Sequence, residues 1–132
     1  MFALSGKVIV VIGGTTGLGL SAAKAFTKAG AKTFIVGRNQ QSLDQALEQL
    51  NSADGIAADA THPKTAAQAI GLAIHKFGAF NGLYHVAGGS GRKFGDGPAH
   101  ELSDEGIDVT LNLNLKSLIY SNRAAIQQFI QQ

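Results

Sequence analysis

The 132-residue sequence contains no cysteine, which excludes disulfide bridges and thiolate metal sites. None of its four histidines is spaced from another as metal ligands are. The apolar run nearest the N-terminus, Val8–Ile12, has five residues and is far too short to span a membrane. The first residues also lack the features of a signal peptide, so we expect a cytoplasmic protein.

Charged residues are few and nearly balanced, with 11 Lys and Arg against 9 Asp and Glu. The net charge of +2, without a Lys/Arg cluster, gives no indication of nucleic-acid binding. Hydrophobic residues make up 45% and charged residues 15% of the chain, which is typical of a folded globular domain. A chain of this length suits one domain with a real core.

Short apolar segments alternate with segments whose apolar residues recur at helical spacing. The β-branched run Val8–Ile12 predicts a strand buried on both faces. Further strands are predicted at Thr33–Val36, Ile56–Ala58 and Leu83–Ala87. The alternation predicts an α/β fold, with a Rossmann-type parallel sheet and helices on both faces.

Helices are predicted between these strands and after the last one. Gly30 is placed at the end of the first helix and Pro63 in the first turn of the third. Ser103 is predicted to cap a last helix that follows the glycine-rich loop Gly88–His100. Doubly wound dinucleotide folds usually have about six strands. With four strands predicted, we expect residues 1–132 to be a single nucleotide-binding domain that is incomplete at its C-terminus.

The glycines between the first strand and the first helix predict a phosphate-binding loop. A helix N-terminus offers unpaired N–H groups, and glycines let the backbone approach a pyrophosphate closely. Two registers fit, one starting at Gly17 and one at Gly13, and we prefer Gly13 because it directly follows the strand. A plain tight turn is the alternative. The residues predicted to bind phosphate are Gly13, Thr15, Thr16, Gly17, Leu18 and Gly19.

The end of the second strand bears on the choice between NADP and NAD. Sites specific for NAD place an acidic residue about 20 residues after the glycines, where this chain has Gly37 followed by Arg38. A planar guanidinium suits a 2′-phosphate. We therefore predict that Arg38 favours NADP, with NAD as the alternative if Arg38 is only a solvated loop charge.

Several segments, taken in order, resemble the short-chain dehydrogenase/reductase family. Ile12-Gly13-x-x-x-Gly17-Leu18-Gly19 is similar to the family's Thr-Gly-x-x-x-Gly-Ile-Gly loop. Asp59-Ala60-Thr61 resembles Asp-Val-Thr after the third strand. His85-Val86-Ala87-Gly88 stands where the family has Asn-Asn-Ala-Gly, and Leu113-Asn114-Leu115-Lys116 resembles Val-Asn-Leu-Lys.

The resemblance implies roles for individual residues. Asp59 would accept a hydrogen bond from the adenine amino group, and the Ala60 N–H would bind a ring nitrogen. Ala87 and Gly88 would line the ribose beside the nicotinamide. Asn114 would kink its helix. It would also be catalytic, because it would hold a water molecule in a proton relay. A solvated strand end for Asp59 and a polar helix break for Asn114 are the alternatives.

Two departures from the family pattern stand out. His85 and Val86 replace both asparagines, so polar cross-links near the sheet centre are expected to be missing. We interpret His85 as a structural residue, with a position facing the cofactor as the alternative. The family's catalytic Tyr-x-x-x-Lys is absent, since neither Tyr84 nor Tyr120 has a Lys four residues on. Both tyrosines are interpreted as core residues, and no appreciable reductase activity is expected from this chain alone.

The sequence thus predicts the NAD(P)-binding part of an oxidoreductase that moves a hydride between NADP(H) and an alcohol or carbonyl substrate. The alternatives are a non-catalytic nucleotide-binding module or decayed enzyme fragment, and a flavodoxin-like protein that shares only the fold. Arg92 and Lys93 in the glycine-rich loop would meet an acidic substrate or simply be solvated. Because family members commonly dimerise through the last helix, we hypothesise that the chain forms a homo-oligomer.

Overall fold

A single parallel sheet organises the computed structural model, which describes residues 3–132. Its strands are β1 (Val8–Ile12), β2 (Lys32–Gly37), β3 (Ala53–Ala57) and β4 (Gly82–His85). The strand order is β3-β2-β1-β4, so the chain crosses from one edge of the sheet to the other after β3. This reversal next to β1 is the topological switch point, where α/β folds open a crevice at the carboxyl ends of the strands.

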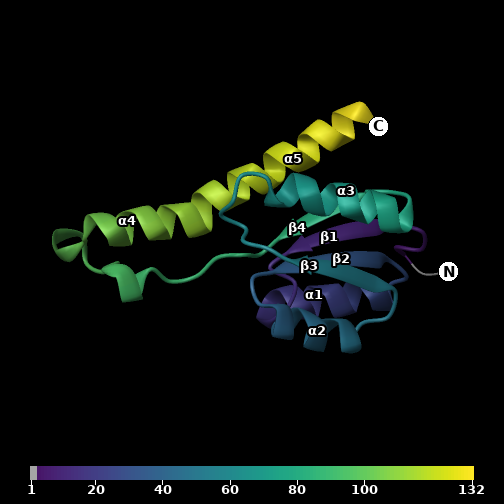
Figure 1. The fold of residues 1–132 in the computed structure, drawn as a ribbon, viewed down its shortest axis with the longest axis horizontal. Helices are drawn as coiled ribbons and strands as arrows, with labels where there is room; N and C mark the ends of the chain where they lie inside the picture. The colour runs from purple at the N-terminus through teal and green to yellow at the C-terminus, as the bar shows by residue number, and fades with distance from the viewer. Residues whose placement is uncertain (1–2) are drawn as a thin grey trace.

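Helices cover both faces of the sheet (Figure 1). One face is covered by α1 (Gly17–Lys28) and α2 (Gln40–Glu48), and the other by α3 (Thr65–Phe77) and α5 (Ser117–Gln131). Figure 1 also shows that α4 (Asp104–Leu111) projects beyond the end of the sheet. These layers confirm the predicted α/β fold. In the described part of the chain, no helix has both the length and the apolarity needed to cross a membrane.

The sheet divides the hydrophobic core into two clusters. Val10 and Val11 are neighbours in β1 and both are 0% exposed, yet they belong to different clusters. Val10 packs with Ile70 of α3, while Val11 packs with Leu43 of α2. A strand with apolar residues on both faces therefore holds the two helical layers together, as the β-branched run predicted.

The third and fourth strands differ from their predicted bounds. The third strand is Ala53–Ala57, not Ile56–Ala58, because its register is set by backbone pairing with β2. The fourth ends at His85, not Ala87, because the N–H groups of Val86 and Ala87 both donate to the carbonyl of Ile12. The chain turns away from the sheet at that point.

The start of α3 and the position of Tyr84 also correct the sequence interpretation. Pro63 lies in a turn, and the helix begins at Thr65 with Lys64 as its N-cap residue. Tyr84 was interpreted as core, but it is 38% exposed because β4 is an edge strand of the described sheet. Its ring packs edge-on against Phe26, with centroids 5.7 Å apart.

The predicted last helix consists of three segments. Ser103 caps α4 by accepting a hydrogen bond from the Gly106 N–H at 2.9 Å, as predicted. A π-helical turn, η3 (Asn112–Lys116), then separates α4 from α5. Such a turn inserts one extra residue into the backbone ladder. The glycine-rich loop is also less irregular than expected, since it contains the short 3-10 helices η1 (Arg92–Phe94) and η2 (Ala99–Glu101).

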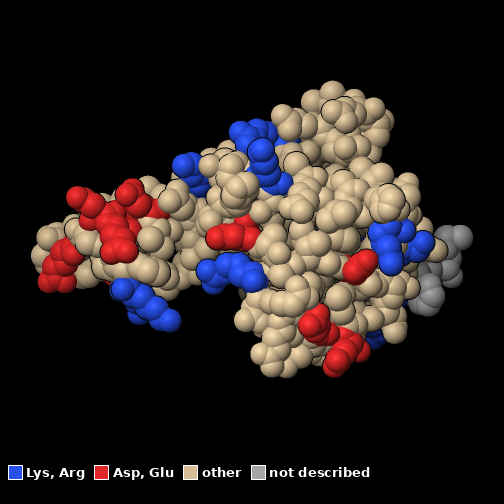
Figure 2. Space-filling model, viewed as in Figure 1, with Lys and Arg blue, Asp and Glu red and all other residues tan. Residues whose placement is uncertain are grey.

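Charged side chains are distributed unevenly over the surface. Figure 2 shows acidic side chains gathered on the projecting end of the molecule, around α4. The acidic residues in this part of the sequence are Asp96, Glu101, Asp104, Glu105 and Asp108. None of these acidic residues lines the cavity at the carboxyl ends of the strands.

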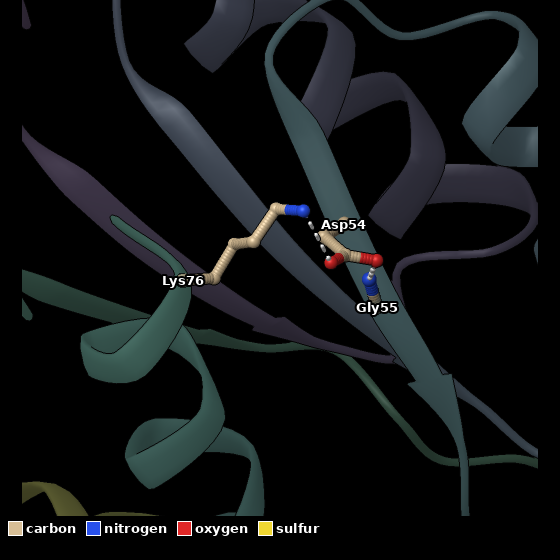
Figure 3. Close-up of polar contacts among 3 residues, drawn as sticks. All are labelled: Asp54, Gly55 and Lys76. Atoms are coloured by element: carbon tan, nitrogen blue, oxygen red, sulfur yellow. Dashed lines mark hydrogen bonds and ion pairs between the residues drawn. The ribbon is translucent and has the colours of Figure 1, made fainter. Parts of the chain in front are cut away.

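An ion pair joins α3 to the edge strand β3 (Figure 3). Lys76 Nζ lies 3.5 Å from one carboxylate oxygen of Asp54, and the other oxygen accepts a hydrogen bond from the Gly55 N–H at 2.8 Å. The Lys76 side chain is 57% exposed. Exposed pairs of this kind typically contribute less than about 1 kcal/mol to stability.

Candidate functional site

A cavity of about 320 Å³ opens at the carboxyl ends of the strands, at the switch point between β1 and β4. Every residue that the sequence predicted to bind the cofactor lines this cavity: Gly13, Thr15, Thr16, Gly17, Leu18, Gly19, Arg38, Asp59, Ala60, Ala87 and Gly88. Four separate stretches of sequence therefore meet in one cleft. Sequence reasoning did not assign the remaining lining residues to the site: Val36, Gly37, Ala58, Val86 and Leu113. Four of them are direct neighbours of an assigned residue and Val36 lies two residues before Arg38, so closeness in the sequence was the available signal.

The loop after β1 is built so that only glycine fits at two positions. Gly13 has a φ of 91°, in the left-handed region that favours glycine. A Cβ on Gly13 would lie 2.7 Å from the backbone nitrogen of Ala87. A Cβ on Gly19 would overlap the carbonyl oxygen of Gly13. The start of α1 thus packs directly against the loop backbone, which brings the helix N-terminus to the cleft.

The N-terminus of α1 is free to bind an anion. Thr16 is the N-cap residue, but its side chain accepts no capping hydrogen bond. By contrast, Asn39 caps α2 by accepting from the Ser42 N–H at 2.9 Å. The first turn of α1 contains no acidic residue, and Leu18 within it is 75% exposed. Unpaired N–H groups and the positive end of the helix dipole therefore face a ligand at the cleft.

Asp59 presents an oriented, ionised carboxylate to the cleft. Its Oδ1 accepts hydrogen bonds from the Thr61 N–H and hydroxyl, each at 2.8 Å. Partial burial raises the pKa of Asp59, but the Thr61 hydrogen bonds and the positive charges of Arg38 and His62 outweigh it and hold the pKa below its ordinary value. Within residues 3–132, Oδ2 accepts no hydrogen bond and Arg38 has no salt-bridge partner.

His85 supplies a polar cross-link that its departure from the family pattern led us to expect to be missing. Its Nδ1 lies 2.8 Å from Ser121 Oγ of α5, and its Nε2 lies 3.0 Å from the carbonyl oxygen of Ala87. Burial lowers the pKa of His85, and the hydrogen bond to Ala87 only partly offsets that effect. His85 is therefore neutral at pH 7 and joins β4 to α5, which corrects the expectation of an absent link.

Asn114 lies inside the π-helical turn and ties that turn to the glycine-rich loop. Its Nδ2 donates to the carbonyl oxygens of Gly89 at 2.7 Å and Thr110 at 3.0 Å. Its Oδ1 accepts from the Gly89 N–H at 2.9 Å. Asn114 itself does not line the cavity, although Leu113 beside it does. The role of Asn114 in a proton relay stays a prediction. Its side chain holds the start of the glycine-rich loop at Gly89.

Nothing in residues 3–132 groups three or more His, Cys, Asp or Glu side chains as a metal site would. The arrangement in the cleft instead suits an elongated anionic ligand. The strand order β3-β2-β1-β4 places the glycine loop at the centre, the carboxylate and guanidinium that follow β3 and β2 at one end, and the small residues that follow β4 at the other. This order of groups fits the pyrophosphate, adenosine and nicotinamide parts of a dinucleotide.

Comparison with known proteins agrees with this geometry. The family described as short chain dehydrogenase matches residues 7–132. L-rhamnose-1-dehydrogenase of Scheffersomyces stipitis is 31% identical over 138 residues, covering 98% of this chain and 52% of the relative.

Solved structures show the same architecture. The crystal structure of 3-ketoacyl-(acyl-carrier-protein) reductase from Brucella melitensis, complexed with NADH, has a TM-score of 0.84 at 28% identity. The match covers 96% of this chain and 51% of the Brucella melitensis protein. An actinorhodin polyketide ketoreductase with NADPH has a TM-score of 0.82 at 25% identity, covering 94% of this chain and 48% of that one.

The chain therefore spans about half the length of the relatives it matches. The two solved relatives hold NADH in one case and NADPH in the other. With a family match over nearly all of its residues and the corresponding fold and cleft, the chain belongs to the short-chain dehydrogenase/reductase family.

Proposed function

We propose that residues 1–132 form the nucleotide-binding domain of an oxidoreductase that passes a hydride between NADP(H) and an alcohol or carbonyl compound. The observation that carries this proposal is the cleft itself. The glycine loop, Arg38, Asp59 with Ala60, and Ala87 with Gly88 come from four parts of the sequence and line one cavity.

The pyrophosphate would bind at the loop between β1 and α1. A Cβ at Gly13 would meet the backbone of Ala87 and one at Gly19 the carbonyl oxygen of Gly13, so glycine at both positions lets the loop and α1 pack closely beside the ligand. Thr16 does not use its hydroxyl as a helix cap, so that hydroxyl and the first N–H groups of α1 would donate to the phosphate oxygens.

The adenosine end of the cleft supports a preference for NADP. Arg38 is exposed beside the cavity and has no salt-bridge partner among the described residues. A guanidinium placed there would bind a 2′-phosphate through paired hydrogen bonds. No carboxylate occupies the end of β2, and a Cβ at Gly37 would collide with the side chain of Thr15. Asp59 would accept from the adenine amino group through its open oxygen.

The nicotinamide end lies against Ala87 and Gly88. Bound there, the nicotinamide ring would supply or accept the hydride. The reaction also needs a proton donor or acceptor at the substrate oxygen, and no Tyr in this sequence has a Lys four residues on. We therefore propose that these 132 residues bind the cofactor without reducing a carbonyl on their own.

The absence of a Tyr with a Lys four residues on also supports a second candidate function, a nucleotide-binding module without catalysis. Both candidates bind the cofactor, so binding does not separate them. Carbonyl-dependent oxidation of NADPH by the protein that contains this chain would exclude the second candidate.

A homo-oligomer is also part of the proposal. A row of half-exposed apolar side chains runs along α4, η3 and α5: Ile107, Leu111, Leu115 and Ile119 are 38%, 50%, 51% and 52% exposed. Exposed apolar rows of this kind usually mark protein contacts. Light scattering after size exclusion is expected to show a dimer or larger species, whereas a monomer at all concentrations would argue against this part.

Cofactor titration tests the main proposal. NADPH, NADH, 2′,5′-ADP and AMP are titrated into the chain by calorimetry. We expect NADPH to bind at least about tenfold more tightly than NADH, because a paired phosphate contact is worth more than about 1.4 kcal/mol. We also expect 2′,5′-ADP to compete with NADPH better than AMP does. If neither dinucleotide binds at millimolar concentration, the proposed function is wrong. If NADPH and NADH bind with equal affinity, the proposed NADP preference is wrong.

A further inference from the structure

His85 is a half-buried titratable side chain that the proposed cofactor contacts do not use. It is the last residue of β4, and its ring lies between the start of the glycine-rich loop and α5. On α5 it meets Ser117 and Ser121, which are 0% and 1% exposed. Small side chains at these two positions allow the helix to approach the strand closely.

The hydrogen-bond partners of His85 define its tautomer. The carbonyl oxygen of Ala87 only accepts, so Nε2, 3.0 Å away, carries the hydrogen. Nδ1 therefore accepts from the Ser121 hydroxyl at 2.8 Å. Ser117 Oγ lies 3.4 Å from Nε2 and donates to the carbonyl of Leu113 at 2.6 Å. The Nε2–H thus has two acceptors within reach, the Ala87 carbonyl and the Ser117 hydroxyl.

These two partners connect His85 to two residues that line the cofactor cleft. Ala87 lines the cleft on the β4 side, and Leu113 lines it on the side of the π-helical turn. Ser117 is the residue that follows that turn, and its bond to Leu113 supports a carbonyl within it. Through its Nε2–H, His85 contacts Ala87 directly and reaches Leu113 through Ser117.

We infer that His85 is a positioning residue for the nicotinamide end of the cleft. This inference rests on the proposed cofactor site. The His85 Nε2–H holds the Ala87 carbonyl, and through Ser117 it fixes the distance between the β4 wall and the π-helical turn. The bond from Ser121 to Nδ1 orients the ring so that Nε2 points at Ala87. The ring acts through Ala87 and Leu113 and does not itself line the cavity.

The two ring nitrogens make different hydrogen bonds, so two substitutions can separate their contributions. His85→Gln keeps an N–H donor near the place of Nε2, and His85→Asn keeps a polar group near the place of Nδ1. His85→Phe keeps the ring volume and loses both. Ser121→Ala removes the orienting hydroxyl with a minimal change in volume. Lys76→Ala, at the far end of α3, is the control for unrelated changes.

Two readouts are measured on the 132-residue chain, with unfolding midpoints recorded for every variant. The first is the pair of Gly88 and Gly89 backbone amide resonances in nitrogen-correlated NMR spectra, which needs no cofactor. The second is the NADPH dissociation constant. We expect His85→Gln to keep both amide resonances and an NADPH affinity within about twofold of the parent. We expect His85→Asn and His85→Phe to shift both resonances and weaken NADPH by about tenfold, because the Ala87 carbonyl loses its partner.

The inference is overturned if His85→Asn matches His85→Gln in both readouts. It is also overturned if NADPH affinity follows the unfolding midpoint whichever nitrogen is replaced, because His85 would then serve stability alone. If the parent chain binds no NADPH, the proposed function fails, and the amide resonances decide this inference by themselves. A parent-like spectrum for His85→Gln beside a shifted one for His85→Asn would support the positioning role, and equal spectra would refute it.

Discussion

Thr61 holds the carboxylate of Asp59 by donating both its backbone N–H and its hydroxyl to the same oxygen, Oδ1, at 2.8 Å each. Oδ2 is left for a ligand, and the carboxylate lines the cleft. Since hydrogen bonds to the ionised form favour it, the pairing keeps the pKa of Asp59 below its ordinary value against the effect of burial. The carboxylate that the proposed adenine contact needs is therefore already oriented and ionised without a ligand.

Replacing Thr61 with Val tests this preparation through pH. The folded pKa of Asp59 lies below the unfolded one, which is about 3.9. The hydrogen bonds therefore stabilise the folded chain above that pH, and their contribution is lost as pH falls through the folded pKa. We expect Thr61→Val to be less stable than the parent at pH 7, with the difference shrinking below about pH 4. Urea unfolding across this range, with a carboxyl NMR titration, measures it, and an unchanged Asp59 pKa would refute the account.

Arg38 is the residue on which the cofactor preference depends. Arg38→Ala is expected to weaken NADPH by about 2 kcal/mol, or roughly thirtyfold, through loss of the charged pair with the 2′-phosphate. NADH affinity is expected to change by less than about twofold, because NADH lacks that phosphate. The control Lys76→Ala removes the same charge from an exposed pair with Asp54 and should leave both affinities unchanged. Equal losses for NADPH and NADH in Arg38→Ala would show that Arg38 does not read the 2′-phosphate.

Two glycine-to-alanine substitutions should act in opposite directions. In Gly19→Ala the new Cβ overlaps the carbonyl oxygen of Gly13, so we expect a loss of about 1–3 kcal/mol in unfolding free energy and a clear loss of NADPH affinity. In Gly71→Ala the new Cβ meets nothing within 4 Å inside α3, so we expect a gain of about 0.5–1 kcal/mol. Denaturant unfolding of both variants checks the pair. A well-tolerated Gly19→Ala would contradict the packing described at the cleft.

The ligand side of the cleft was predictable from sequence, because in a parallel sheet the residues that follow the strands meet at one edge. Gly13, Asp59 and Ala87 are such residues, and they do meet in one cavity. Strand β3 was less predictable, since Ala53, Asp54 and Gly55 lack an apolar pattern and their place depends on pairing with β2.

The support behind the cleft was not predictable. The π-helical turn at Asn112–Lys116 contains Asn114, for which the family resemblance implied a kink, but the apolar residues around it did not mark its position. The partners of His85 lie 36 residues away, at Ser121, and 32 residues away, at Ser117. Contacts over such separations depend on how α5 docks on the sheet, which periodicity does not determine.

Thr33 provides a test of the core that does not involve the ligand. Its side chain is 0% exposed in β2, and its Oγ1 has no hydrogen-bond partner among the described residues. An unsatisfied buried hydroxyl costs about 1–3 kcal/mol, so Thr33→Val is expected to raise the unfolding free energy by about 1 kcal/mol. Thr61→Val, whose hydroxyl is bonded, should lower it at pH 7. A destabilised Thr33→Val would mean that this hydroxyl is bonded in solution.

The central claim is that the cleft between β1 and β4 holds a nicotinamide dinucleotide, and mapping NADPH onto the backbone amides by NMR tests it most directly. We predict shifts at the glycine loop, at Arg38, at Asp59 and Ala60, and at Ala87 and Gly88, which are the residues that line the cavity. The amide resonances at the far end of α3, around Lys76, should not shift. Shifts confined to the projecting α4 end, or none at all, would contradict the claim.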